Sequence, residues 1–471
     1  MQGEFKGDFT RDTFHRAKHF SRVLMQQGRV QLDADWNEQT SILLHYLRTL
    51  AADLIGPHGG PAAPNADAGE GFIIQATSSP SNDFTIGIGR YYVEGVLCEN
   101  GPLHTDGSAP TYFSQPDYSR DKEKDALTDG PWLVYLDVWE RHIVCNQDDD
   151  IREVALGWPD TATRAKVVWQ VKTTGAQPDS PIQLTDFQTD DSAWSQYVAK
   201  NLQGDNRGLL KAQVQPQQTS TDPCTISPQS KYRGPENQLY RVEIHSPNTS
   251  NSDTNTPATF KWSRENGSVI FPILDFPSSS SQIVLTLANV GRDERSGLHE
   301  GNWVEIVDDD SILQNQPGDL LKVLKIDRTS MTVTLDGIAS GAIGGDPTKH
   351  PLLRRWEGTN KISESNGSND ADWTLLEDGV QIQFRPPTDD KTQNQYRTGD
   401  YWLIPARVAT GDVEWPKVRG PQGNLVPDAL PPHGVEHHYA PLAVITVNSG
   451  TVASDVTDLR RMFKAQVMPS S

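Results

Sequence analysis

The apolar positions near the start of the chain follow the periodicity of a helix. Between Asp33 and Leu54 they recur at intervals of three and four residues, which brings them to one side of a helix. They are Trp36, Leu43, Leu44, Leu47, Leu50, Ala51 and Leu54. Asp33 and Asp35 are candidates for the N-terminal cap, and Gly56-Pro57 would end the helix because proline cannot continue it. The sequence therefore predicts an amphipathic helix roughly 30 Å long.

A second apolar line on this helix, formed by Leu32, Ile42 and Tyr46, makes its apolar face wider than one neighbour requires. Residues 1–56 are predicted to form an arm and a docking helix, and residues 57–70, rich in Gly, Pro and Ala, a linker. The apolar face needs a partner, which is either a β domain of the same chain or another subunit. We expect another subunit.

Patterns typical of strands dominate the rest of the chain. Residues 83–100, 131–145 and 167–171 predict strands of a first β domain at 71–175, and the 131–145 strand has bulky residues on both faces, which indicates burial between layers. The polar stretch 176–236 predicts a connection with one short helix near 191–202. Short strands separated by turn residues predict a second β domain, a sandwich or small barrel, at 237–345, followed by a C-terminal β region at 346–471.

The predicted fold class is therefore mainly β, with two or three β-sandwich or barrel-like domains preceded by an N-terminal arm and one long amphipathic helix. The core or a seam between domains is the expected place of Arg355, Trp356, Tyr401 and Trp402.

Charge and composition narrow the class of partner. The 471 residues include 62 Asp and Glu against 42 Lys and Arg, a formal net charge of −20, which disfavours nucleic acid and anionic membrane surfaces. No apolar run is long enough to predict a membrane span, and the charged N-terminus does not predict an export signal. Three widely spaced cysteines indicate reduced thiols. We expect a protein that assembles in the cytoplasm.

Several long strings of the chain carry a family likeness. They include KGDFTRDTF, HFSRVLMQQGRVQLDADWNEQ, REVALGWPDTATRAKVVWQVK, YRVEIH, FKWSRENGSVIFP, LRRWEG, GDYWLIPAR and HHYAPLAVI. Together they resemble an uncharacterised bacterial family found with phage-tail-like contractile injection systems, with one departure at Gly157-Trp158, where a second Gly is expected. The segment QGRVQLDADWNEQ also resembles N-terminal segments of phage baseplate and tail-fibre attachment proteins.

The resemblance implies a structural or accessory part of a contractile particle, at or around the baseplate, and no catalytic residue. The implied partners are other subunits of the particle, such as baseplate or sheath-proximal proteins, and further copies of this chain. The particle is either released or tethered to a membrane. For docking we select the arm and helix residues Phe9, Phe14, Arg22, Trp36, Leu43 and Leu47.

The sequence patterns give only weak support to any metal site. The stretch from Asp33 to Asn37 opens like a calcium loop, but Glu38 replaces the required Gly. The triplets 148–150 and 308–310 are more typical of solvated loops, and His299-Glu300 lacks the second His of a zinc motif. The remaining cluster, His433, His437 and His438, runs into a strand pattern that sends neighbouring side chains to opposite faces. We predict no catalytic residue, metal or cofactor.

Two other functions stay open on the sequence. A glycan-binding adhesin could use some of the 12 Trp and 12 Tyr, although Trp132, Trp139, Trp169, Trp262, Trp303 and Trp402 lie in strand patterns typical of core packing. A polysaccharide-cleaving tail enzyme would need two carboxylates on either side of a cleft, and 62 acidic residues allow such a pair.

Overall fold

The computed structural model describes residues 3–62, 71–78, 82–101, 107–175, 184–203, 206–215, 231–251, 254–276, 282–292, 295, 297–337, 343–367, 370–387, 393–420 and 423–464. Within these residues the fold is mainly β, as the sequence predicts, with sandwich-like layers, one closed barrel and few helices. No helix in this part of the chain is long and apolar enough to cross a membrane.

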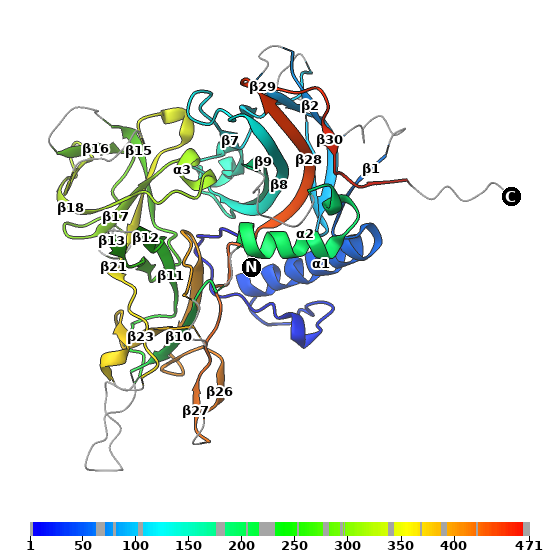
Figure 1. Ribbon diagram of the computed structural model, residues 1–471. Coiled ribbons are helices and arrows are strands. Elements are labelled where there is room, and N and C mark those ends of the chain that lie inside the picture. Colours follow the sequence, from blue (N-terminus) through cyan, green and yellow to red (C-terminus); the bar gives the residue numbers. More distant parts are fainter. Residues whose placement is uncertain are drawn as a thin grey trace, which may run out of the picture.

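The first body packs two sheets over one apolar core (Figure 1). One sheet contains β8 (Gly130–Ile143), β9 (Arg164–Gly175), β28 (His438–Asn448), β29 (Thr451–Val452) and β30 (Thr457–Asp458). The other contains β1 (His58–Pro61), β4 (Gly89–Val93), β5 (Val96–Asn100) and β31 (Met462–Phe463), next to the hairpins β2 (Ile74–Ala76)–β3 (Phe84–Ile86) and β6 (Ser114–Gln115)–β7 (Tyr118–Ser119). Alternating β8 residues pack on opposite faces: Val134, Leu136 and Val138 face this core, whereas Leu133 and Tyr135 belong to a second cluster.

The second body is also made of two packed sheets. The larger is formed by β21 (Gly358–Lys361), β14 (Thr259–Ser263), β11 (Gln238–Ser246), β24 (Tyr401–Arg407) and β25 (Asp412–Val413), in that order. The smaller is formed by β10 (Leu209–Val214), β23 (Val380–Arg385) and β22 (Thr374–Leu375). Two further hairpins are β12 (Thr249–Asn251)–β13 (Thr254–Thr256) and β26 (Lys417–Arg419)–β27 (Leu425–Pro427).

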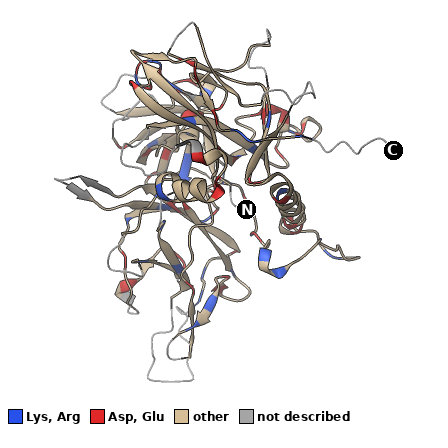
Figure 2. Ribbon diagram, turned by 45° about the vertical axis from the view of Figure 1, so that its right-hand side comes forward, with Lys and Arg blue, Asp and Glu red and all other residues tan. Residues whose placement is uncertain are grey.

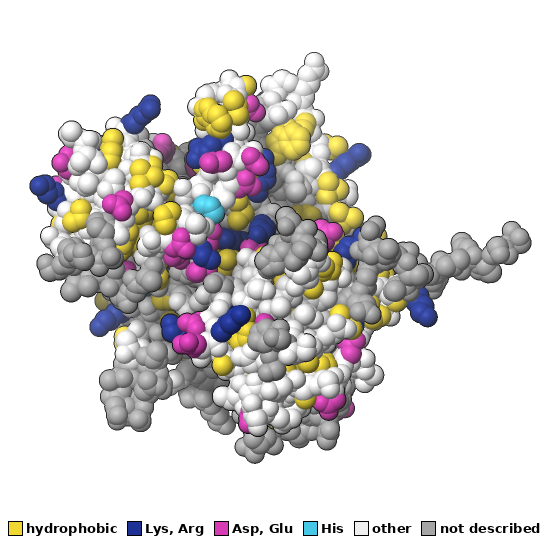
Figure 3. Space-filling view, turned by 90° about the horizontal axis from the view of Figure 1, so that it is seen from above, with side chains coloured by type: hydrophobic (Ala, Val, Ile, Leu, Met, Phe, Trp, Pro, Cys, Tyr) yellow, Lys and Arg dark blue, Asp and Glu magenta, His cyan; other side chains and the backbone are white. Residues whose placement is uncertain are grey.

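The third body is a closed six-stranded barrel, a form that leaves no unpaired sheet edge. Its strands, in spatial order, are β15 (Ile270–Asp275), β16 (Ile283–Leu287), β19 (Thr332–Leu335), β18 (Asp319–Asp327), β17 (Trp303–Val307) and β20 (Leu352–Trp356). The short helix α3 (Asp309–Leu313) follows β17. The face of the molecule that is seen from above in Figure 3 carries small groups of apolar side chains among charged ones.

Strands far apart in the chain pair across the predicted domain boundaries. The linker 57–70 contains β1, which pairs with β4 and β31, and the polar connection contains β10, which pairs with β23. The boundary at 345/346 separates β20 from the barrel that it closes, and β28 of the C-terminal region pairs with β8 of the first body. Strand pairing therefore crosses these predicted boundaries, because local composition does not show which strands share a sheet.

Two helices of seven or more residues lie on the first body. The long helix α1 (Asp33–Ile55) matches the predicted helix, and α2 (Asp191–Tyr197) continues into a π-helical turn at Val198–Gln203. Besides α3, the other helical segments are short 3-10 helices: η1 (Arg16–Lys18), η2 (Asp149–Ile151), η3 (Val154–Leu156), η4 (Leu184–Gln188), η6 (Pro347–Lys349) and η7 (Asp370–Asp372). Figures 1 and 2 show α1 at the outside of the β bodies.

The first residues of the arm are anchored where the three bodies meet. The Gly3 carbonyl accepts a hydrogen bond from Tyr401 Oη at 2.8 Å, and the Phe5 carbonyl accepts one from Arg241 Nη1 at 2.9 Å. Buried charges surround this segment and pair with one another, including Glu4, Lys6, Glu243, Lys261 and Glu305. The arm therefore leaves the body from a fixed point. As predicted, Arg355, Trp356, Tyr401 and Trp402 are buried.

Candidate functional site

The two ends of helix α1 are held by different hydrogen bonds. At the C-terminal end Gly56 adopts φ 93° and donates its N–H to the Ala52 carbonyl at 2.8 Å, as the Gly-Pro pair predicts. At the N-terminal end the capping residue is Leu32, which has no capping side chain. The predicted cap Asp33 instead accepts hydrogen bonds from the backbone N–H (2.8 Å) and the hydroxyl of Thr10. Its carboxylate thus joins the arm to the helix.

Most of the apolar face of α1 lies in solvent. Among its 23 residues only Ala34 and Ile42 are buried. Trp36 is 64% exposed, Leu43 53%, Leu47 62% and Leu54 77%. A helix in a folded protein gains most of its stability from a covered apolar face, so this exposure indicates an unfilled contact.

The exposed apolar surface continues onto the arm before the helix. Half of the exposed large apolar side chains in the described residues, 12 of 24, lie between positions 20 and 54. They are Phe20, Leu24, Met25, Val30, Leu32, Trp36, Leu43, Leu44, Tyr46, Leu47, Leu50 and Leu54, which we call the docking face. Large apolar patches of this kind mark interaction sites in soluble proteins.

Polar contacts hold the other side of α1 on the first body. Arg48 forms a two-point ion pair with Glu140 of β8, with N···O distances of 3.0 and 2.9 Å. The arm adds hydrogen bonds from Thr13 Oγ1 to Glu38 (2.7 Å) and from the Val23 N–H to Gln39 (2.8 Å). These contacts position the helix without covering the docking face.

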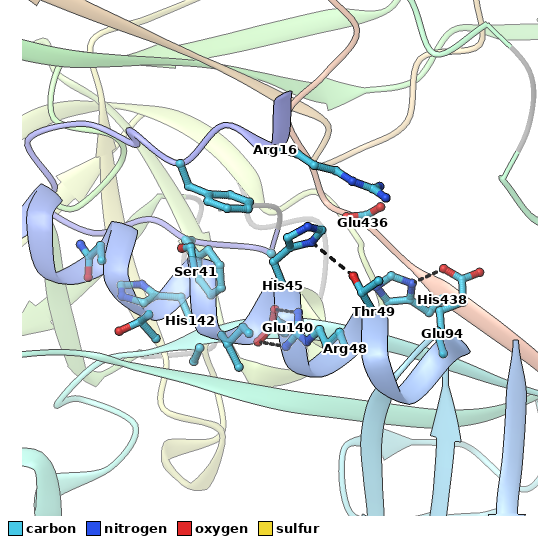
Figure 4. A pocket seen from close by; sticks show the side chains of 18 of the residues that line it. Arg16, Ser41, His45, Arg48, Thr49, Glu94, Glu140, His142, Glu436 and His438 are labelled. Atoms are coloured by element: carbon cyan, nitrogen blue, oxygen red, sulfur yellow. Dashed lines mark hydrogen bonds and ion pairs between the residues drawn. The ribbon is translucent and has the colours of Figure 1, made fainter. Parts of the chain in front are cut away.

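A groove of about 620 Å³ lies between α1, the arm and the first body (Figure 4). His142 of β8 is buried there against the rings of Phe5 and Phe9, and burial lowers its pKa to about 4. Burial also acts to lower the pKa of His438, but the hydrogen bond to Glu94 at 2.8 Å raises it above its ordinary value. The two pairs Arg48–Glu140 and His438–Glu94 are therefore satisfied bridges that join the elements around the groove.

The structure separates the six selected docking residues into two groups. Trp36, Leu43 and Leu47 belong to the docking face, and Arg22 is exposed on the arm. Phe9 and Phe14 are half-buried and pack on the same chain, against His142 and His45 at ring distances of 5.9 and 5.7 Å. The apolar residues Met25 and Val30 were not selected. The sequence shows them as apolar residues in a segment with several charged ones, but no helical periodicity distinguishes them.

The residues considered for metal binding hold structural positions. Asp308 caps α3 through the Ser311 N–H (2.9 Å), and Asp148 caps η2. His437 pairs with Asp137 at 2.7 Å, whereas His433 Nδ1 accepts the Leu403 N–H at 3.3 Å. In the part of the chain that the structure describes, no three His, Cys, Asp or Glu side chains gather as metal ligands would.

The tryptophans lie mainly inside the bodies. The six strand tryptophans are buried or half-buried, as their patterns predict: Trp132, Trp139, Trp169, Trp262, Trp303 and Trp402. The exposed tryptophans are Trp36 on α1 and Trp158 in the loop between β8 and β9. Exposed aromatic surface is thus concentrated away from the sheets.

Comparison with known proteins relates the whole fold to one family. The model of a family of unknown function, DUF6519, matches residues 5–188 and 203–453. No curated protein and no solved structure matches the chain. Because the match extends from the arm through all three bodies, the chain belongs to this family of unknown function.

Proposed function

We propose that this protein is a structural or accessory component of a contractile phage-tail-like injection particle, at or around its baseplate, and that it acts through protein–protein contacts. The observation that carries the assembly part is the docking face, where 12 large apolar side chains lie exposed between positions 20 and 54. The type of particle is supported by the sequence strings that resemble proteins of such systems.

The contacts that attach α1 to the first body also support a role in assembly. Its polar side is fixed to β8 by the Arg48–Glu140 pair, and the start of the arm is fixed by Tyr401 and Arg241. A helix held in place before it meets its partner loses less conformational freedom on binding. The docking face is therefore presented as a preorganised apolar ridge, suited to a groove on another subunit.

The test is whether the chain enters particles through α1. The tagged full chain is produced in its native cell, and particles are separated by gradient sedimentation and inspected by electron microscopy. We expect the wild-type chain to co-sediment with contractile particles. The double variant L43E/L47E should remain in the slow fraction, because two carboxylates on the docking face would have to be buried in the contact.

A matched control places the same changes on other exposed leucines. Leu274 of β15 and Leu425 of β27 are 62% and 66% exposed, and these fractions are similar to those of Leu43 and Leu47. L274E/L425E should co-sediment like the wild type. The proposal is overturned if the wild-type chain is missing from the particle fraction, or if L43E/L47E enters it as well as the control does.

A further inference from the structure

We infer that the arm and α1 of one copy dock on the loop between β8 and β9 of a second copy, so that two copies pair reciprocally. The inference rests on the proposed function, assembly through the docking face, and names the partner. It is argued from the charges and the apolar side chains of the two surfaces.

The arm is basic within an acidic protein. Residues 13–32 contain Arg16, Lys18, Arg22 and Arg29 and no Asp or Glu, a formal charge of +4, whereas the whole chain carries −20. No carboxylate of the described residues forms an ion pair with these four side chains. Because exposed apolar residues such as Leu24 lie among them, the surface complementary to the arm is both acidic and apolar.

The loop at residues 148–160 has that combination. It contains five acidic residues against the single cation Arg152, a formal charge of −4. Three apolar side chains project from it into solvent: Val154 is 60% exposed, Leu156 66% and Trp158 58%. The loop is thus the counterpart of the arm, with apolar residues at its centre and the opposite charge around them.

Hydrogen bonds within the loop hold these apolar side chains in place. Arg152 donates to the Asp149 carboxylate at 2.9 Å and to the Trp158 carbonyl at 3.2 Å, and the Trp158 N–H donates to the Glu153 carbonyl at 3.1 Å. Arg152 also forms a backbone bridge with Asp160. A loop with fixed geometry pays little ordering entropy on binding, which suits it to receive a partner.

The segment that follows the loop and part of the arm line the same groove. Thr163, Arg164 and Ala165, which follow the loop, line the groove under α1 together with Phe14 and Arg16 of the arm. A two-fold axis on this side of the molecule would set the arm of each copy against the loop of the other. Such a contact is self-complementary, whereas arm against arm or loop against loop would bring like charges together.

The experiment measures the mass of the purified full chain by sedimentation velocity over a concentration series. We expect the wild type to form a dimer that weakens as salt is raised. The arm variant R22E/R29E and the loop variant D150K/E153K should each associate roughly a hundredfold more weakly, because each reduces the formal charge of its segment to zero and adds repulsive charges to both contacts. An equimolar mixture of the two variants should form a heterodimer, because both of its contacts are again complementary.

The mixture controls for misfolding, since only folded variants can restore the dimer. The inference is overturned if the wild type stays monomeric, or if the wild type dimerises but the mixture does not. A wild type that is monomeric and still enters particles through Leu43 and Leu47 overturns the reciprocal contact alone. A dimer that never enters particles overturns the proposed function alone.

Discussion

The helices α1 and α2 are both amphipathic and both attached to the first body, yet their apolar faces have different environments. In α2, Trp194 and Tyr197 are 4% and 8% exposed and pack with Phe187 against residues of β8 and β28. The Trp194 indole donates to the Tyr439 carbonyl at 3.1 Å. In α1, Trp36 is 64% exposed. An apolar helix face thus indicates that another surface must pack against it. That surface can belong to the same chain or to another one.

The length of the helix explains part of this difference. The seven-residue α2 cannot be stable alone, so its covered face must supply its stability. With 23 residues, α1 can stay helical while one side is free, provided that polar contacts and the arm hold the other side. A long helix that is held along one side can present the apolar surface of its other side to a partner.

The largest expected effect comes from comparing the two helix tryptophans. Trp194→Ala removes a buried indole and its hydrogen bond, and should lower the free energy of unfolding of the first body by about 3–5 kcal/mol. Trp36→Ala should change it by less than about 0.5 kcal/mol, because the side chain is exposed. Urea unfolding of both variants measures the difference. Equal losses would mean that α1 is covered by its own chain in solution.

Acidification should loosen the arm before it affects α2. Burial lowers the pKa of His142 to about 4 from an ordinary 6.5, so between these values the released, solvated form binds more protons than the packed form. Stability of the arm packing is therefore present above pH 6.5 and is lost as the pH falls towards 4, by up to about 3 kcal/mol. Phe187, which packs against α2, does not titrate, and burial raises the pKa of Tyr439 above its ordinary value, so neither changes its charge in this range.

Hydrogen exchange at pH 7 and pH 5, corrected for intrinsic rates, tests this expectation. Protection of residues 3–14 should fall at pH 5, whereas that of residues 191–203 should not. At pH 5 Glu4 stays ionised: burial acts to raise its pKa, but Lys6, Arg354 and Arg241 together lower the pKa below its ordinary value. His142→Phe removes the titrating group and should keep the arm protected. Equal loss in both segments, or in the variant, would contradict the role of His142.

The smallest effect is expected from the ion pair that holds α1. Arg48→Met removes the two-point pair with Glu140, which is partly exposed, and should cost at most about 1 kcal/mol. Exchange of the α1 amides should become about fivefold faster while the melting temperature hardly changes, and Arg48→Lys should recover part of the loss. The comparison variant is Asp191→Asn, which removes the ion pair between Asp191 of α2 and Arg461.

Asp191→Asn should leave the exchange of α2 unchanged, because Trp194 and Tyr197 hold that helix through apolar contacts. If it loosens α2 as much as Arg48→Met loosens α1, the two helices are held in the same way and the distinction between them is wrong.

Much of the fold was accessible from local patterns. The periodicity around Leu43 and Leu47 with Gly56-Pro57 predicts α1 to within one residue of its observed end. The alternation in β8 predicts its burial between layers. The domain boundaries were not accessible, because β20 closes the barrel and β28 pairs with β8 through contacts between residues far apart in the chain.

The candidate site divides in the same way. Residue types alone give α1 its wide apolar face, since each side chain carries its own preference for leaving water. Only the tertiary structure decided that Trp36 and Leu47 stay uncovered, that Phe9 packs on His142, and that Asp33 joins the arm instead of capping the helix. The physical reason is that hydrophobicity is non-directional. It requires that a surface be covered, whereas the packing of distant strands and the anchoring of the arm determine which surface is near enough to cover it.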